Sequence, residues 1–576
     1  MYFLALATDY DGTLAHDGVV DPESIEALHR LKQSGRRVIL VTGRELADLQ
    51  RVFPELELCD LAVVENGAVL YNPTTGRETP VANPPPEALV RRLQELRVQP
   101  LSIGRSIVAT WEPMETVVLE AIRELGLELQ ITFNKGAVMV LPAGINKASG
   151  LGAALGELGL SRHNVVGVGD AENDHAFLSI CGCSVAVANA LDAVKDTADL
   201  TTAGARGKGV IELIDDLMAT DLCHVVEHST RHRVTIGTDE GGTPLHIDPI
   251  AGSILVAGVS GGGKSTKVAG ILEQLAAQEF QYVVIDPEGD YAELEDAVVL
   301  GDAERRPRDA EAIEVLRRGD GYVVLNLLGV GIADRPGFLA GLLPQLCQLR
   351  QQTGRPHWIV IDEAHHMLPA TPAADGAALP QDMRATILVT VHPDQVALAA
   401  LRSVRTVMAV GAKPADTIRR FCEVSGDTAP TVPDARGLEP GEALVWERGS
   451  EGTPRRVRIT GPRQERRRHT RKYAEGELGP DRSFYFRGPT GALNLRAQNL
   501  SLFVQIAEGI DDGTWLHHLE AGDYSAWVRE SIKDDELAAD LAAVERDTSL
   551  DAGASRAKIK KAIESRYTGP AAEGQR

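Results

Sequence analysis

Short apolar runs alternate with amphipathic stretches in two separate blocks of this chain, and this alternation constrains its fold more than any other feature. In residues 1–218 the apolar runs are YFLALATD, RRVILVTG, LAVVENG and NVVGVGD. In residues 231–461 they are GSILVAG, QYVVID, GYVVLNL, HWIVID, ATILVTV and RTVMAVG. Strands that alternate with helices form parallel sheets covered by helices, and ligands bind beside the carboxyl ends of such strands. The chain is therefore predicted to be an α/β protein with a candidate site in each block.

The composition is typical of a globular chain. Apolar residues make up 43% and charged residues 24%, and no apolar run approaches the roughly 18 residues that cross a bilayer. Asp9 and Asp11 come too early for a signal peptide, and the 6 scattered cysteines imply no disulfide framework. We therefore expect a cytoplasmic protein that makes no contact with a membrane.

The charge does not favour a nucleic-acid partner. The net charge is −23, from 59 basic and 82 acidic residues. A local contact with phosphate backbone stays open at residues 455–472, where nine Lys or Arg residues accompany one Glu. A solvated linker explains this basic stretch equally well.

Four polar segments at strand or helix ends predict a phosphate site in the first block. Asp9 and Asp11 are two apart at a strand end, so both carboxylates can face one crevice. Thr42-Gly43-Arg44 ends the next apolar run, Lys147 opens a helix, and Gly169–Asp174 supplies further acids. Each segment alone is more typical of a turn or a solvated helix start. Together they predict a hard cation such as Mg²⁺ beside a phosphoryl group that a carboxylate attacks, giving an aspartyl-phosphate.

The order DYDGT (9–13), TGR (42–44), Lys147 and GDAEND (169–174) resembles the haloacid dehalogenase-like phosphatases of the Cof-type, or type IIB, subgroup. The resemblance implies a Rossmann-like core with an inserted cap, an Mg²⁺ cofactor and a small phosphorylated metabolite, by default a sugar phosphate. It also implies the residue roles. Asp9 would be the nucleophile, Asp11 the general acid and base, and Thr42 and Lys147 would hold the phosphoryl group. Metal ligands would come from Asp9, Asp11, Asp170, Asn173 and Asp174, and Arg44 and Asn66 would contact the substrate.

The second block contains a phosphate-binding loop between a strand and a helix. Residues 258–265, GVSGGGKS, match the pattern G-x-x-x-x-G-K-S. Glycines let backbone N–H groups surround phosphate oxygens, Lys264 would reach the β- and γ-phosphates, and Ser265 would ligate Mg²⁺. Asp362, at the end of another apolar run, would hold the Mg²⁺ water shell, and Glu363 would activate the attacking water. The predicted nucleotide-binding residues are Gly258, Gly261, Gly262, Gly263, Lys264, Ser265 and Thr266.

VVIDPEGDY (283–291) and IDEAH (361–365) resemble the HerA–FtsK group of P-loop ATPases. That resemblance implies ATP as ligand and a homo-oligomeric ring in which a neighbouring arginine completes each site. Arg402, Arg405 and Arg419 are the candidates, and the choice among them stays open. A polar sensor is expected at Thr390 or His392, although HPDQ (392–395) departs from the threonine–glutamine pair of the group.

These patterns predict the domain boundaries. The phosphatase core is expected at residues 1–82 and 145–220, the cap at 83–144, the P-loop ATPase at 228–462, a basic linker at 463–481, a small C-terminal domain of mostly α or α+β structure at 482–547, and a disordered tail at 548–576.

Three functional hypotheses follow. The first is an Mg²⁺-dependent phosphatase joined to an ATP-binding and ATP-hydrolysing domain. The alternative is a HerA-like motor acting on nucleic acid or protein, with the phosphatase as an accessory or sensor. The third is a regulatory phosphatase that is gated by nucleotide.

Overall fold

The computed structural model describes most of the chain. The residues that it describes are 2–134, 136–226, 233–247, 252–259, 262–294, 296–319, 321–371, 383–432, 437–449, 453–462, 478, 483–491, 493–532 and 534–564. In this part of the chain, no helix is both long enough and apolar enough to cross a membrane.

The first unit is built on an eight-stranded sheet with the order β12-β11-β10-β1-β2-β3-β4-β5. Strands β12 to β3 run parallel, and β4 and β5 extend the sheet in antiparallel fashion. The strands are β1 (Ala5–Thr8), β2 (Arg37–Val41), β3 (Leu61–Val64), β4 (Val69–Asn72), β5 (Arg77–Pro80), β10 (Val165–Gly169), β11 (Cys183–Ala186) and β12 (Leu200–Thr201). The helices are α1 (Pro22–Gln33), α2 (Leu46–Val52), α5 (Lys147–Leu158), α6 (His175–Ile180), α7 (Asp192–Thr197), α8 (Gly207–Thr220) and α9 (Cys223–Val226).

The central strands are apolar because both faces of the sheet are covered. All four residues of β1 are buried, and so are all five residues of β10. Helix α1 begins at Pro22, whose fixed φ suits a first helical position, and it packs its buried Leu28 and Leu31 into the core of this unit. The parallel α/β core predicted from the first block is confirmed.

An antiparallel cap interrupts this unit between β5 and α5. Its sheet has the order β6-β7-β9-β8. Its elements are α3 (Glu87–Glu95), β6 (Ser102–Ile103), β7 (Val108–Trp111), α4 (Glu115–Glu124), β8 (Leu129–Asn134) and β9 (Ala137–Pro142). Helices α3 and α4 cover one face of the sheet, where Leu89, Leu93 and Val118 share a core with Val108 and Val140. All these elements lie within residues 83–144.

The second unit has an eleven-stranded sheet with the order β14-β13-β23-β22-β21-β15-β20-β19-β16-β18-β17. Strands β21 to β17 of this order run parallel, and the remaining four are antiparallel. The strands are β13 (Val234–Asp239), β14 (Pro244–Ile247), β15 (Ser253–Gly258), β16 (Tyr282–Asp286), β17 (Ala297–Leu300), β18 (Tyr322–Asn326), β19 (Trp358–Ile361), β20 (Thr386–Thr390), β21 (Val404–Val410), β22 (Glu442–Glu447) and β23 (Arg455–Ile459). The helices are α10 (Lys264–Ala277), α11 (Asp309–Arg318), α12 (Arg335–Thr353), α13 (Ala364–Met367), α14 (Leu398–Leu401) and α15 (Pro414–Ser425).

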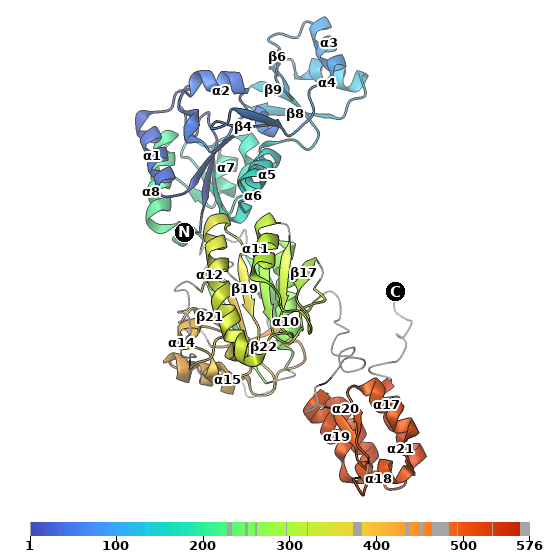
Figure 1. Ribbon diagram of the computed structural model, residues 1–576. Helices are drawn as coiled ribbons and strands as arrows, with labels where there is room; N and C mark the ends of the chain where they lie inside the picture. The colour runs from blue at the N-terminus through green and yellow to red at the C-terminus, as the bar shows by residue number, and fades with distance from the viewer. Residues whose placement is uncertain are drawn as a thin grey trace.

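The two units contact each other at the end of the first unit that lies opposite the cap (Figure 1). The ring of His163 stacks on Phe280, and its Nε2 lies 2.9 Å from the carbonyl oxygen of Gln278. His357 Nε2 lies 2.8 Å from Ser161 Oγ. His163, Phe280, Ser161 and His357 are all buried, so this contact excludes water.

The C-terminal domain is mostly helical. Its elements are β24 (Phe484–Phe486), β25 (Leu495–Ala497), α17 (Leu500–Gly509), α18 (Asp512–Ala521), α19 (Asp523–Trp527), a π-helical turn (Val528–Ile532), α20 (Asp535–Glu545) and α21 (Ala552–Ile563). Trp515, Tyr524 and Trp527 belong to its hydrophobic core.

Helix α21 corrects the expectation of a disordered tail from residue 548. Ile559 and Ile563 are one turn apart on this helix and are both buried in the C-terminal core. Small and charged residues surround these two positions in the sequence and hide the apolar stripe. The expected basic linker, 463–481, lies outside the described residues except for Leu478, which is buried in the same core.

Candidate functional site

Three neighbouring strands of the first sheet bring the predicted phosphate-site residues to one edge. Strand β1 pairs with β10 on one side and with β2 on the other, and Thr8 lies opposite both Val168 and Leu40. Asp9 and Asp11 follow β1, Thr42 follows β2, and Asp170 follows β10. Since parallel strands end together, residues far apart in the sequence meet at this edge.

Lys147 lies at the centre of this group. Its Nζ is 2.6 Å from Asp9 Oδ1 and 2.6 Å from Asp174 Oδ1, and the residue is only 1% exposed. Burial acts to lower the pKa of Lys147, but the carboxylates of Asp174 and Asp9 outweigh it, so the pKa is raised above its ordinary value. The lysine is therefore a fixed positive charge between two carboxylates.

The start of helix α5 is positioned by a tight turn. The side chain of Asn146 accepts hydrogen bonds from the backbone N–H groups of Ala148 and Ser149, which caps the helix. Gly67 has φ +106° and lies so close to Asn146 that an added Cβ would come within 1.9 Å of its carbonyl oxygen. Only glycine fits this position. The close packing of Gly67 against Asn146 fixes the start of the helix, from which the side chain of Lys147 reaches Asp9.

Asp9, Asp170 and Asp174 could hold a metal ion together. Each offers a carboxylate oxygen, and these atoms lie within 4.8 Å of one another. Burial first, and then the charge of Asp174, raises the pKa of Asp9 to about 7, while Lys147 opposes this rise. Asn173 Oδ1 is also buried, and it has no hydrogen-bond partner among the residues that the structure describes. Hard oxygen donors packed this closely fit a divalent cation such as Mg²⁺.

Asp174 has a supporting position within this cluster. One of its oxygens accepts from Lys147, and the other accepts from the backbone N–H groups of Asp170 and Ala171 at 2.8 and 2.9 Å. These bonds hold the turn that carries Asp170. Asp9 and Asp170 are therefore the better placed direct ligands of the three.

Asp11 and Arg44 form a two-point ion pair beside this cluster. Arg44 Nε and Nη2 each donate to a carboxylate oxygen of Asp11 at 2.7 Å, and Nη1 donates to Asp48. These bonds raise the pKa of Arg44, with the hydrogen bond to Asp11 as the main cause. Thr42 Oγ1 accepts from the backbone N–H of Arg44 at 3.2 Å. The guanidinium is thus already bound on both sides by carboxylates of the chain.

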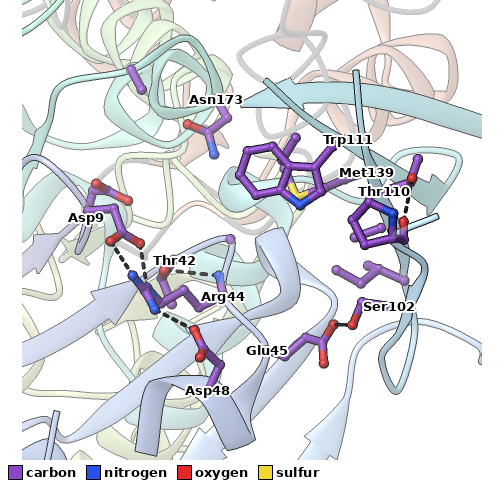
Figure 2. A pocket seen from close by; sticks show the side chains of 17 residues that line it. Asp9, Thr42, Arg44, Glu45, Asp48, Ser102, Thr110, Trp111, Met139 and Asn173 are labelled. Atoms are coloured by element: carbon purple, nitrogen blue, oxygen red, sulfur yellow. Dashed lines mark hydrogen bonds and ion pairs between the residues drawn. The ribbon is translucent and has the colours of Figure 1, made fainter. Parts of the chain in front are cut away.

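A cavity of about 580 Å³ separates the strand ends from the cap. Figure 2 shows Asp9, Thr42 and Arg44 on one side of it and Trp111 and Met139 on the other. The lining residues are Asp9, Asp11, Thr42, Gly43, Arg44, Glu45, Asp48, Pro100, Ser102, Ile107, Ala109, Thr110, Trp111, Ala137, Met139, Ala171 and Asn173.

Two glutamates of the core hold the cap over this cavity. Glu65 is buried, and its Oε1 and Oε2 accept from the backbone N–H groups of Arg105 and Ser106, each at 2.8 Å. Ser102 Oγ donates to Glu45. Both contacts join the core to the segment of the cap that precedes β7. They therefore help to fix the position of the cap relative to the strand ends of the core.

In the second unit, Lys264 and Ser265 begin helix α10 directly after the glycine loop. Gly263 caps this helix at φ +75°, a conformation that suits glycine. Lys264 Nζ donates to the carbonyl oxygens of Gly258 and Val259 at 3.1 and 3.3 Å. Ser265 Oγ donates to Asp290 at 3.0 Å. The strand and the helix that flank a phosphate-binding loop are therefore present, and Ser260 and Gly261 of the loop lie outside the described residues.

Acidic residues gather beside this loop at the ends of β19 and β16. Asp362 follows β19, and burial, together with the charges of Glu363, Asp286 and Asp290, raises its pKa well above the ordinary value. Burial likewise raises the pKa of Asp286 to about 6. Since a cation would relieve this clustering of negative charge, the arrangement suits an Mg²⁺–nucleotide complex.

His365 connects these acids to the expected sensor strand. Its Nδ1 lies 3.1 Å from Thr390 Oγ1 and 3.3 Å from Glu363 Oε2. Thr390 Oγ1 also accepts from the backbone N–H of His392 at 3.0 Å. Burial lowers the pKa of His365 to about 4, so the ring is neutral at pH 7.

The first unit matches the family model described as haloacid dehalogenase-like hydrolase over residues 6–101 and 108–214. A phosphoglycolate phosphatase from Methanothermobacter thermautotrophicus is 30% identical over 226 residues, which cover 37% of this chain and 98% of that protein. The chain belongs to the haloacid dehalogenase-like hydrolases. Phosphoglycolate phosphatase 2 from Saccharolobus solfataricus (28% identical, covering 38% of this chain and 93% of that protein) is also similar. So is the 5-amino-6-(5-phospho-D-ribitylamino)uracil phosphatase YcsE from Bacillus subtilis (26% identical, covering 34% and 88%).

The second unit of this haloacid dehalogenase-like hydrolase matches the model described as helicase HerA, central domain, over residues 234–331. The predicted fusion of a hydrolase unit with a HerA-like unit is confirmed by the two matches.

The structure places most of the predicted site residues of this hydrolase at its two sites. Asp9, Asp11, Thr42, Arg44 and Asn173 line the cavity. Lys147, Asp170 and Asp174 lie beside Asp9. Asn66 is buried and accepts from Asn173 Nδ2 at 3.2 Å, so it holds Asn173 and does not line the cavity. Thr266 is exposed on α10.

Several residues of these sites were not predicted. Asp48 and Glu45 belong to the cavity, Glu65 to the cap contact, and Asp290 to the contact with Ser265. Glu65 lies in the stretch ENG (65–67), and Asp290 lies in VVIDPEGDY (283–291). Neither stretch indicates which distant residue its carboxylate contacts. Trp111, on β7 of the cap, also lines the cavity and was not predicted.

Proposed function

We propose that the first unit is an Mg²⁺-dependent phosphatase that hydrolyses a small phosphorylated metabolite through an aspartyl-phosphate on Asp9. The observation that carries this proposal is the position of Lys147, whose Nζ lies 2.6 Å from Asp9 Oδ1 with both residues buried beside an open cavity. The lysine offsets the charge of the nucleophile and of an incoming phosphoryl group. The named relatives act on phosphoglycolate or on a phosphorylated ribitylamino-uracil. These are small phosphomonoesters, and a sugar phosphate is the default class that we propose.

Asp9 and Asp11 take part in both chemical steps that we propose. In the first, an Asp9 oxygen forms a bond to phosphorus while the bond to the leaving alcohol breaks, and Asp11 gives its proton to that alcohol. In the second, Asp11 takes a proton from water, the water oxygen bonds to phosphorus, and the bond between phosphorus and Asp9 breaks. In the structure both carboxylate oxygens of Asp11 accept from Arg44 at 2.7 Å, so one of these two contacts opens when Asp11 carries the proton.

Asp9 and Asp170, with Asp11, Asn173 and Asp174 nearby, would hold Mg²⁺, and the ion would supply positive charge that stabilises the phosphoryl oxygens.

The test is phosphate release from a panel of phosphomonoesters with and without Mg²⁺. We expect Asp9→Asn to abolish release, because an amide cannot act as the nucleophile. Asp192→Asn is the matched control, since that side chain is 97% exposed in the same unit. Equal release by wild type and Asp9→Asn would refute the proposal.

We propose further that the second unit binds and hydrolyses ATP. Support comes from the helix that begins at Lys264, from the contact of Ser265 with Asp290, and from the buried Asp362. Lys264 would contact the β- and γ-phosphates, Ser265 and Asp362 would hold Mg²⁺ and its water shell, and Glu363 would activate water.

The contact between the units favours nucleotide gating as a second candidate function. Helix α10 begins at Lys264, and the carbonyl oxygen of Gln278, directly after the helix, lies 2.9 Å from His163 Nε2. His163 is two residues before β10, which leads to Asp170. A shift of α10 on nucleotide binding would thus reach the phosphatase site. Gating predicts that a non-hydrolysable ATP analogue changes phosphate release, without any nucleic acid, in wild type and not in Lys264→Ala.

A further inference from the structure

We infer that the phosphatase cavity selects phosphomonoesters whose leaving alcohol is uncharged and carries a ring that stacks on Trp111, and that it disfavours alcohols that carry a carboxylate. This inference rests on the proposed phosphatase function and narrows its substrate class. It concerns the cap side of the cavity, whose residues take no part in the chemical steps.

The cap presents an apolar sheet face to the cavity. Side chains alternate along a strand, and residues directly opposite on paired strands share a face. Ala109 pairs with Met139 and Trp111 pairs with Ala137, so these four residues lie on one face of β7 and β9. All four line the cavity, as does Ile107. The opposite face is already covered by α3 and α4.

On this face of the cap sheet, the side chain of Trp111 is accessible to solvent. It is 53% exposed, whereas Met139 is 4% exposed and Ile107 is 1% exposed, because both pack against Ala68 and Leu141. The neighbours of Trp111 on the cavity face are the small residues Ala109 and Ala137. They leave the indole accessible across the cavity from the side that carries Asp9 (Figure 2). An indole beside small residues suits the flat face of a ring.

The charges of the cavity exclude a second anionic group. Besides Asp9 and Asp11, which belong to the proposed phosphoryl and metal site, two further lining residues are acidic, namely Glu45 and Asp48. Among the described lining residues the sole base is Arg44, and its guanidinium is held by Asp11 and Asp48. A carboxylate on the leaving alcohol would lose water beside apolar and acidic side chains without gaining a cation. The cavity therefore rejects such an ester through repulsion and desolvation.

Four phosphate esters of primary alcohols test the preference for a ring and the exclusion of a carboxylate separately. Benzyl phosphate carries an aromatic ring, glucose 6-phosphate a sugar ring, glycerol 1-phosphate a neutral chain, and 2-phosphoglycolate a carboxylate. We expect kcat/KM to fall in the order ring-bearing, neutral chain, carboxylate, with roughly tenfold between the first and the last. The order of the two ring esters distinguishes an aromatic from a sugar substrate.

Substitution of the indole tests the stacking itself. Trp111→Ala is expected to lower kcat/KM for the preferred ring ester roughly tenfold, through KM, and to change it less than twofold for glycerol 1-phosphate. Trp111→Phe should recover most of the loss because it keeps a ring. Phe133→Ala is the matched control. Phe133 is 46% exposed in the same cap sheet, and its pairing with Val138 places it on the other face.

A preference for 2-phosphoglycolate, or an equal loss on all four esters in Trp111→Ala, would overturn the inference and leave the proposed phosphatase intact. Failure of wild type to hydrolyse any of the four with Mg²⁺ would overturn the proposed function and the inference with it.

Discussion

The imidazole ring of His163 stacks on the phenyl ring of Phe280, with 3.8 Å between the ring centroids and 15° between the ring planes. His163 belongs to the hydrolase unit and Phe280 to the HerA-like unit. Each residue adjoins an element that leads to one of the two sites, β10 in the first unit and α10 in the second. The stacked rings are thus a direct contact between the hydrolase unit and the HerA-like unit.

We expect the stack to stabilise both units. Phe280 is 1% exposed, so Phe280→Ala should lower the free energy of unfolding by about 3–5 kcal/mol. A double-mutant cycle with His163→Ala should give a coupling of about 0.5–1.5 kcal/mol. Denaturant unfolding followed separately by the activity of each unit would measure both. Additive effects of the two substitutions would show that the rings do not stabilise each other.

Acid should weaken the contact between the units through His357. Burial, followed by the charges of His163, Arg355 and Arg350, lowers the pKa of His357 well below 6.5. The backbone N–H of Gln281 donates to His357 Nδ1 at 2.8 Å, and this hydrogen bond also requires an unprotonated Nδ1. Below pH ~6.5 the unfolded chain takes up a proton that the folded chain does not. The stability is therefore full above that pH and falls as the pH is lowered.

His357→Gln, which cannot be protonated, should flatten this decline in unfolding experiments between pH 7 and pH 5. His246→Gln is the control, because His246 is exposed in the same unit. If both variants kept the slope of wild type, other groups would be responsible for the pH dependence.

Lys264→Ala should abolish ATP binding and leave phosphate release from a phosphomonoester unchanged in the absence of nucleotide. The side chain donates to the carbonyl oxygens of Gly258 and Val259 in the glycine loop, where a bound nucleotide would place its phosphates, so its loss removes the positive charge that would meet them. Calorimetric titration with ATP checks the first outcome. Lys413→Ala, at an exposed lysine of the same unit, should bind normally. Loss of phosphate release in folded Lys264→Ala would contradict separate active sites.

Glu65→Gln should loosen the cap. One of the two 2.8 Å hydrogen bonds to the cap loop loses its acceptor oxygen, and the other loses the charge that strengthens it. We expect KM to rise about tenfold with a smaller change in kcat, because a charge-assisted bond contributes about 1.5–3 kcal/mol. Steady-state kinetics on the best ester would show this. Glu57→Gln, at an exposed glutamate of the core, is the comparison, and an equal effect in both variants would exclude a specific role for Glu65.

Local patterns were enough to predict both sheets and most of the residues at their carboxyl ends. The reason is geometric, since a buried parallel strand must be apolar along its length and must end where the chain leaves the sheet. Asp9 and Asp170 stand directly after such strands, whereas Lys264 was found from the glycine-loop motif that follows one of them. The helix at Ala552–Ile563 was missed because two isoleucines among small and charged residues are a weak helical pattern. Their role becomes clear only in the folded domain, where both pack into its aromatic core.

The sequence by itself determined that this chain holds two α/β units, each with candidate phosphate-site residues at strand or helix ends, because these properties depend on residues close together in the chain. Tertiary structure decided which distant residues share a site. Arg44 is bound by Asp11 and Asp48, Glu65 holds the cap, and His163 stacks on Phe280. Each of these contacts depends on how separate elements pack, and packing brings together side chains whose separation in the sequence carries no periodic pattern.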